Sequence, residues 1–253
     1  MPHLDAVQWV VLALAAVFAG FSKTAIGGAG AVAAAMFALM LPARESTGVL
    51  LPLLIAGDFI GVSVYRRSAD WRLMGRLMPW VLLGIGLGVF FVATVRGDRA
   101  MRTSIGVMIL VVLLAQLAVG RRLRERLTET GGRATPAQHV AAGIAGTAAG
   151  FATMVANSAG SIMTVYLLLS GVAMLEFLGT GAWFFLIVNL IKLPFSGRLG
   201  LVQASSLTLD LLLLPALAVG ATLGVVLIKR IKQQQFERAA LWMAGVSALF
   251  LLV

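Results

Sequence analysis

The chain has 253 residues, of which 60% are hydrophobic and 12% are charged, and its formal net charge is +10. Soluble domains are about 45–50% apolar and about 25% charged, so this composition excludes a water-soluble globular protein and indicates a membrane protein. The sequence contains no cysteine, which excludes disulfides, thiolate metal sites and cysteine nucleophiles.

Ten apolar segments can be placed along the chain. Those of the first half cover about 7–21, 28–41, 46–66, 74–95 and 101–119, and those of the second half about 137–152, 158–170, 175–194, 207–228 and 237–253. A helix needs about 20 residues to cross the hydrocarbon core of a membrane. The first two segments of each half are shorter, so we expect short broken or re-entrant helices at the centre of the protein.

The two halves of the chain resemble each other. The glycine-rich stretch Gly20–Gly30 interrupts the first half, and a counterpart at Gly150–Gly160 interrupts the second half. Further matched residues follow in the same order along both halves: Glu45 and Glu176, Asp58 and Asn189, Pro79 and Pro215, Gly84 and Gly220, and Arg102 and Arg238. Because five segments per half is an odd number, the second half would enter the membrane from the opposite side.

The predicted fold is therefore an all-α polytopic membrane protein with two inverted-topology repeats. We expect a single membrane transport domain over residues 1–253, with repeat 1 at about 7–119, a basic linker at about 120–136 and repeat 2 at about 137–253.

The positive charge of the chain lies in short loops between apolar segments. Basic residues stay on the cytoplasmic side of a membrane, so these loops are topology signals and do not indicate a nucleic-acid partner. The main basic clusters, at residues 66–76, 121–133 and 229–238, all fall on one side of a ten-segment protein. We expect that side to be cytoplasmic and both termini to lie outside. The first residues lack the positive charge of a signal peptide, so we expect the first apolar segment to be retained.

Polar side chains in the two glycine-rich breaks predict an anion site. Helix amino termini present unpaired N–H groups and partial positive charge, and glycine lets the backbone approach a ligand closely. The expected substrate-binding residues are the polar residues and glycines of the breaks together with one asparagine: Ser22, Lys23, Thr24, Gly27, Gly28, Gly30, Thr153, Asn157, Ser158, Gly160, Ser161 and Asn189. The alternative is that the small residues serve helix packing and that Lys23 extends to the membrane surface.

Asp58 lies in the middle of an apolar segment with no cation within one helical turn. A carboxylate at that depth is costly, and loss of water favours its neutral form, so Asp58 is the candidate for proton coupling. Its counterpart in the second half is Asn189, which cannot titrate. The alternative is a purely structural ion pair between Asp58 and Lys23.

Several other residues have two interpretations each. Lys192 shares a helix face with Asn189 and could line the same cavity, but it lies close to the predicted segment end at Pro194, so we expect its ammonium to extend to the membrane surface. Four aromatic residues are either gate candidates or packing residues: Phe177, Trp183, Phe184 and Phe185. We expect Asp210 to be a charge at the start of a helix.

No catalytic arrangement emerges from the sequence. Its two histidines, His3 and His139, lie outside the apolar segments, and there is no G-x-S-x-G motif and no Walker loop. We therefore expect no enzyme, no metal site and no cofactor, and any active transport would be driven by a gradient.

Stretches that cover nearly the whole chain in order match one family: Gly20–Thr24 with the glycines that follow, Leu51–Leu54 with Asp58, Tyr65–Arg67, Asn157–Gly160, Trp183–Phe185, Asn189–Phe195 and Gly220–Gly224. In these stretches the chain resembles the sulfite exporter TauE/SafE family, also called the toluene sulfonate uptake permease family. The resemblance implies a multi-pass permease of the plasma (inner) membrane that moves small sulfur-containing anions such as sulfite, sulfoacetate or related organosulfonates. The family often places a proline after each break, whereas this chain has none at residues 32–36 or 160–162.

The functional hypothesis is a secondary transporter for a small sulfur-containing anion, working by alternating access with proton coupling through Asp58. An uncoupled anion channel with the same site is the alternative. The expected partners are the small anionic substrate and membrane lipid, and the sequence is compatible with a homo-oligomer.

Overall fold

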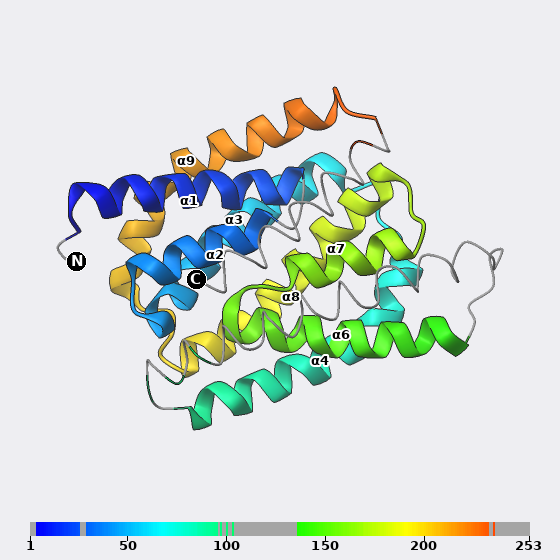
Figure 1. Cartoon of the computed structure of the whole chain (residues 1–253), viewed down its shortest axis with the longest axis horizontal. Helices are drawn as coiled ribbons and strands as arrows, with labels where there is room; N and C mark the ends of the chain where they lie inside the picture. The colour runs from blue at the N-terminus through cyan, green and yellow to red at the C-terminus, as the bar shows by residue number, and fades with distance from the viewer. Residues whose placement is uncertain are drawn as a thin grey trace.

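The computed structural model describes residues 4–25, 29–95, 97, 100, 103, 136–232 and 235. Within these residues the chain forms eight α-helices and no strand: α1 (Ala6–Thr24), α2 (Ala29–Met40), α3 (Ala43–Tyr65), α4 (Trp71–Thr94), α6 (Pro136–Ala156), α7 (Gly160–Leu169), α8 (Met174–Arg198) and α9 (Ala204–Ile228). The helices run roughly along one common axis (Figure 1). Five of them, α1, α3, α4, α8 and α9, are long and apolar enough to cross a membrane. The prediction of an all-α polytopic membrane protein is confirmed.

The observed helices follow the predicted segments with two differences in length. As expected, α2 has 12 residues and α7 has 10, each shorter than a membrane span. In contrast, α1 has 19 residues and α6 has 21, so the prediction of a short first segment in each half is wrong. Both helices continue through the glycine at which we expected the break to begin. The predicted segments 101–119 and 237–253 lie almost entirely outside the described residues, as does the linker.

The glycines Gly20 and Gly150 are packing residues inside helices. A Cβ atom added to Gly20 would overlap the carbonyl oxygen of Leu217 on α9, and one added to Gly150 would overlap the carbonyl oxygen of Val81 on α4. Small residues allow two helix backbones to approach this closely in a membrane. At Gly20 and Gly150, the structure agrees with the alternative that the small residues serve helix packing.

Helix α1 ends at Thr24 and α2 begins at Ala29, while α6 ends at Ala156 and α7 begins at Gly160. Asn157 has φ of 53°, a left-handed conformation that is uncommon for residues other than glycine. The short helices α2 and α7, which begin at these breaks, contact each other. The two breaks are therefore brought together, with α3 and α8 packed against each other beside them.

Lys192 and Asp210 lie deeper in their helices than expected. Helix α8 continues through Pro194 to Arg198, so Lys192 does not lie at its end. A membrane helix tolerates proline when its neighbours satisfy the freed backbone groups. Helix α9 begins at Ala204, so Asp210 is not in its first turn, and the expectation of a helix-start charge is wrong. Asp210 is buried, and neither of its carboxylate oxygens has a hydrogen-bond partner among the described residues.

Candidate functional site

A buried ion pair joins the end of α1 to the middle of α3. The Nζ atom of Lys23 lies 2.7 Å from Oδ1 of Asp58, and the two side chains are 7% and 0% exposed. Lys23 therefore does not extend to the membrane surface, which removes that alternative. Removing two charges from water is costly, and a buried pair persists only when further contacts satisfy its remaining polar atoms.

The second oxygen of the Asp58 carboxylate is satisfied from α8. Asn189 donates from Nδ2 to Oδ2 of Asp58 over 2.6 Å, and both side chains are buried. Three helices thus converge on one carboxylate, and residues from both halves of the chain, Asp58 and its counterpart Asn189, touch each other.

A second lysine lies inside the protein. Lys192 is only 1% exposed, and its Nζ donates to the Thr153 backbone carbonyl at 2.8 Å, to the Thr153 hydroxyl at 3.0 Å and to Oδ1 of Asn157. The expectation that Lys192 extends to the membrane surface is wrong. Because α8 does not end at Pro194, the lysine faces the interior and holds the end of α6.

Asn157 connects the second break to the first half of the chain. Its side-chain amide accepts from Lys192 and donates from Nδ2 to the Thr47 carbonyl oxygen over 2.8 Å. The left-handed backbone of Asn157 ends α6 and turns the chain into α7. Its side chain is thereby fixed from both α3 and α8.

A small polar cavity lies where these elements meet. Most of its lining was expected from the sequence: Ser22, Lys23, Gly30, Thr153, Asn157, Gly160 and Asn189, to which Leu54 and Phe185 are added. Gly30 is in the first turn of α2, and Gly160 is the first residue of α7. The cavity therefore adjoins two helix amino termini as well as one ammonium group.

The remaining expected binding residues are not placed in this cavity. The Thr24 hydroxyl donates to the Ala221 carbonyl oxygen over 2.7 Å, where α1 packs on α9. Ser158 is buried within the second break but does not line the cavity. Gly27, Gly28 and the side chain of Ser161 lie outside what the structure describes.

The aromatic residues of α8 divide into three environments. Trp183 contacts residues outside α8: its Nε1 donates to the Arg66 carbonyl oxygen over 3.3 Å, and its ring centre lies 5.3 Å from that of Trp71. Phe184 is fully buried, with its ring edge-on to Phe185 at 5.1 Å. Neither Trp183 nor Phe184 lines the polar cavity.

Phe185 is the aromatic residue at the site. The Lys23 ammonium lies 4.5 Å from the centre of its ring, within the range of a cation–π contact. The sequence marked Phe185 only as one of four aromatic gate candidates, since neither spacing nor composition distinguishes which of three consecutive aromatic residues faces inward.

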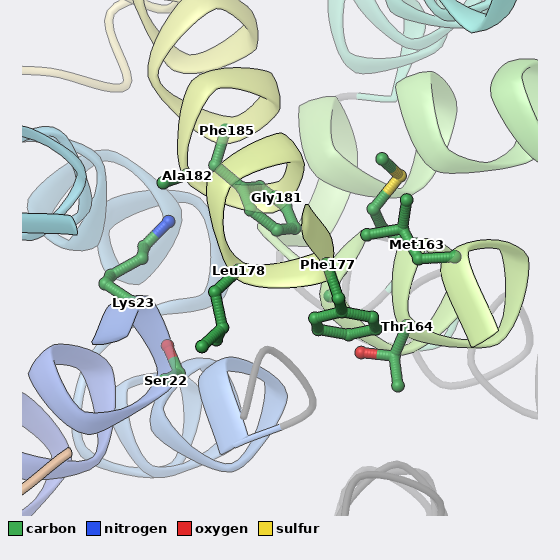
Figure 2. Close-up of a pocket in the computed structure, with 11 residues that line it drawn as sticks. Ser22, Lys23, Met163, Thr164, Phe177, Leu178, Gly181, Ala182 and Phe185 are labelled. Carbon is green, nitrogen blue, oxygen red and sulfur yellow. The ribbon is translucent and has the colours of Figure 1, made fainter. Parts of the chain in front are cut away.

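A second small cavity adjoins the first. The two cavities share four lining residues, Ser22, Lys23, Gly160 and Phe185. Figure 2 shows the second cavity between α7 and α8, with Phe177 and Thr164 facing each other across it. Its walls are otherwise mostly apolar.

The described ionisable groups at the centre are two lysines, Lys23 and Lys192, and one carboxylate, Asp58. Among the described residues, no group of three or more His, Cys, Asp or Glu side chains could hold a metal ion.

Comparison with known proteins gives one match. A search of curated proteins and a search of solved structures each found no similar protein. The family model described as sulfite exporter TauE/SafE matches residues 12–251, which is nearly the whole chain. The expected resemblance is confirmed, and the polar cavity lies within the matched region. The chain belongs to the TauE/SafE family of sulfite exporters, a family of membrane transporters.

Proposed function

We propose that this protein is a secondary transporter that binds a small sulfur-containing anion in the polar cavity and moves it by alternating access. The observation that carries the proposal is the polar cavity where two broken helices meet, one from each half, with the Lys23 ammonium beside it. Broken helices around a central site are the usual binding arrangement of secondary transporters with internal repeats.

The groups around the polar cavity suit an oxyanion. The amino termini of α2 and α7 supply backbone N–H groups that have no partner within their own helices. Lys23 supplies a full positive charge, and the amides of Asn157 and Asn189 and the hydroxyl of Thr153 supply polar contacts. A sulfite or sulfonate group presents three oxygens, which such a set of donors could surround.

The contact between Asp58 and Lys23 supports a role for Asp58 in proton coupling. In the structure the Asp58 carboxylate pairs with the Lys23 ammonium, which is the group that an anion would bind. Protonation of Asp58 would cancel its charge and free Lys23 for the anion, while departure of the anion would let the ion pair form again. Substrate and proton would then bind together, which is the linkage that a coupled carrier requires.

The helix packing supports two inverted repeats. In repeat 1, a Cβ on Gly84 of α4 would overlap the Thr147 carbonyl oxygen of α6; in repeat 2, a Cβ on the matched Gly220 of α9 would overlap the Val17 carbonyl oxygen of α1. Thr147 and Val17 are themselves matched between the halves. Each half thus makes the same contact with the other, as expected for two units related by a pseudo-two-fold axis. In this arrangement the protein lies in the plasma membrane. The basic loop at 66–72 is on the cytoplasmic side, and both termini are on the outer side.

The test is sulfite flux into liposomes that contain the purified protein. We expect saturable uptake, inhibition by short sulfonates, and accumulation above the external concentration when a proton gradient is imposed. Flux that only follows the sulfite gradient would indicate an uncoupled channel, and absence of any protein-dependent flux would refute the proposed substrate. Thr222→Val is a suitable control, because the Thr222 hydroxyl is exposed and only donates to Ala218 of its own helix.

A further inference from the structure

The second cavity is built differently from the first. Its walls come from Met163 and Leu167 of α7 and from Phe177 and Leu178 of α8, with Gly181 leaving room at the helix surface. It adjoins the polar cavity at Phe185. An anion held beside Lys23 would therefore have an apolar space next to it that its charged oxygens cannot use.

Apart from Ser22 and Lys23, which also line the polar cavity, one described polar side chain lines the second cavity. Thr164 is 1% exposed and lines the second cavity, and its hydroxyl has no hydrogen-bond partner among the described residues. In Figure 2 the Thr164 hydroxyl is directed towards Phe177. Threonine hydroxyls inside helices usually bond to the carbonyl of the preceding turn, as the Thr222 hydroxyl does here. A buried hydroxyl without a partner is costly, and a ligand that bonds to it would recover that cost.

We propose that the second cavity holds the short, uncharged tail of an organic sulfonate whose head group occupies the polar cavity, and that Thr164 recognises a hydroxyl or carbonyl group on that tail. This inference rests on the proposed function and narrows its substrate class. Thr164 is then a specificity-determining residue, and the hydrogen bond it makes distinguishes the substrate from alkyl sulfonates of the same length.

The charge around the second cavity further restricts which chemical groups the substrate tail can carry. The only ionisable side chain among its lining residues is Lys23, and the ammonium of Lys23 contacts Asp58 and the Phe185 ring. A carboxylate or ammonium at the end of the tail would enter an apolar space without a counter-charge, which is unfavourable. The preferred substrate is therefore a monoanion, represented by 2-hydroxyethanesulfonate.

The experiment compares the binding of three anions to the purified protein by calorimetry, with flux in liposomes as a second readout. The anions are sulfite, ethanesulfonate and 2-hydroxyethanesulfonate. We expect wild type to bind 2-hydroxyethanesulfonate about tenfold more tightly than ethanesulfonate, as one additional buried hydrogen bond would give. In Thr164→Val this preference should disappear while sulfite binding stays unchanged. Thr164→Ser should retain the preference, and Thr222→Val should behave as wild type.

Folding of the variant is not a concern, since valine has the shape of threonine and removes a hydroxyl that lacks a partner. We expect the Tm of Thr164→Val without ligand to equal or exceed that of wild type. Equal affinities for the two organic sulfonates in wild type, or an unchanged preference in Thr164→Val, would overturn the role of Thr164 while sulfite transport stands. Absence of binding and flux for all three anions would refute the proposed function and this inference together.

Discussion

The Lys23 ammonium and the Asp58 carboxylate lie 2.7 Å apart in the interior of the protein, joining the last turn of α1 to the middle of α3. The ammonium also faces the polar cavity and the Phe185 ring. In the proposed mechanism, an arriving anion would compete with Asp58 for the Lys23 ammonium. This competition would make Asp58 the point at which anion binding and protonation are linked.

Changing Asp58 to asparagine tests this linkage. Asp58→Asn removes the competing charge but keeps an oxygen near Lys23, so we expect anion binding to persist and to become insensitive to an imposed pH gradient. Sulfite uptake should still run down its own gradient, without accumulation above the external concentration. Liposome flux with and without a proton gradient is the measurement. Accumulation that responds to the pH gradient as in wild type would show that Asp58 is structural.

Changing Lys192 to methionine tests the second buried lysine. Lys192→Met removes the donor to Thr153 and Asn157, which releases the end of α6 that forms one wall of the polar cavity. We expect the KM for the anion to rise about tenfold and the Tm to fall, as is typical for loss of a buried charge-assisted hydrogen bond. Lys229→Met changes an exposed lysine at the end of α9 and serves as the control. Equal KM values in both variants would contradict a role for Lys192 in the site.

The packing glycines predict a sharp contrast in stability. Gly20→Ala and Gly150→Ala each place a methyl group against the backbone of a facing helix, which cannot move aside as a flexible side chain can. We expect a large loss of folded protein, from an overpacking cost of about 1–3 kcal/mol or more. Gly86→Ala on α4 is the control, because no atom lies within 4 Å of its added Cβ. Thermal unfolding in detergent measures the difference. Equal Tm values for Gly20→Ala and Gly86→Ala would show that α1 and α9 are not packed as described.

The proposed inverted arrangement of the halves predicts the side of the membrane on which each of two loops lies. Because the natural chain has no cysteine, a single introduced cysteine gives an unambiguous label. We expect Arg67→Cys, after α3, to react only when a membrane-impermeant thiol reagent reaches the cytoplasmic side, and Arg198→Cys, at the end of α8, to react from outside. Both positions are exposed in the structure. Labelling of both from the same side would exclude inverted repeats.

Hydropathy and glycine patterns predicted most of the fold, because the membrane requires long apolar helices and allows breaks only at buried positions. The helices α1 and α6 end inside the two predicted glycine-rich stretches, but several residues after the first glycine of each. Gly20 and Gly150 permit close helix packing, whereas Asn157 takes the left-handed turn, and a sequence alone does not distinguish a glycine needed for approach from one needed for a turn.

Much of the polar cavity was predicted from the residue types at the breaks, but the position of Lys192 was not. Its closeness to Pro194 suggested a helix end, since proline cannot donate to the helix ladder. The helix continues to Arg198, which places the lysine in the interior. Thr164 also gave no signal in the sequence, because an isolated threonine in an apolar segment normally bonds to its own helix. Thr164 is distinguished only because its hydroxyl has no hydrogen-bond partner among the described residues.

The most direct test of the proposed anion site is a calorimetric titration of sulfite into wild type and a neutral variant of the ion pair. The double change Lys23→Met with Asp58→Asn removes both charges together, so no uncompensated charge remains in the interior to unfold the protein. We predict saturable binding to wild type and binding weakened by about tenfold or more in the double variant, with Asp58→Asn alone still binding. Equal sulfite affinity in wild type and the double variant would contradict an anion site at Lys23.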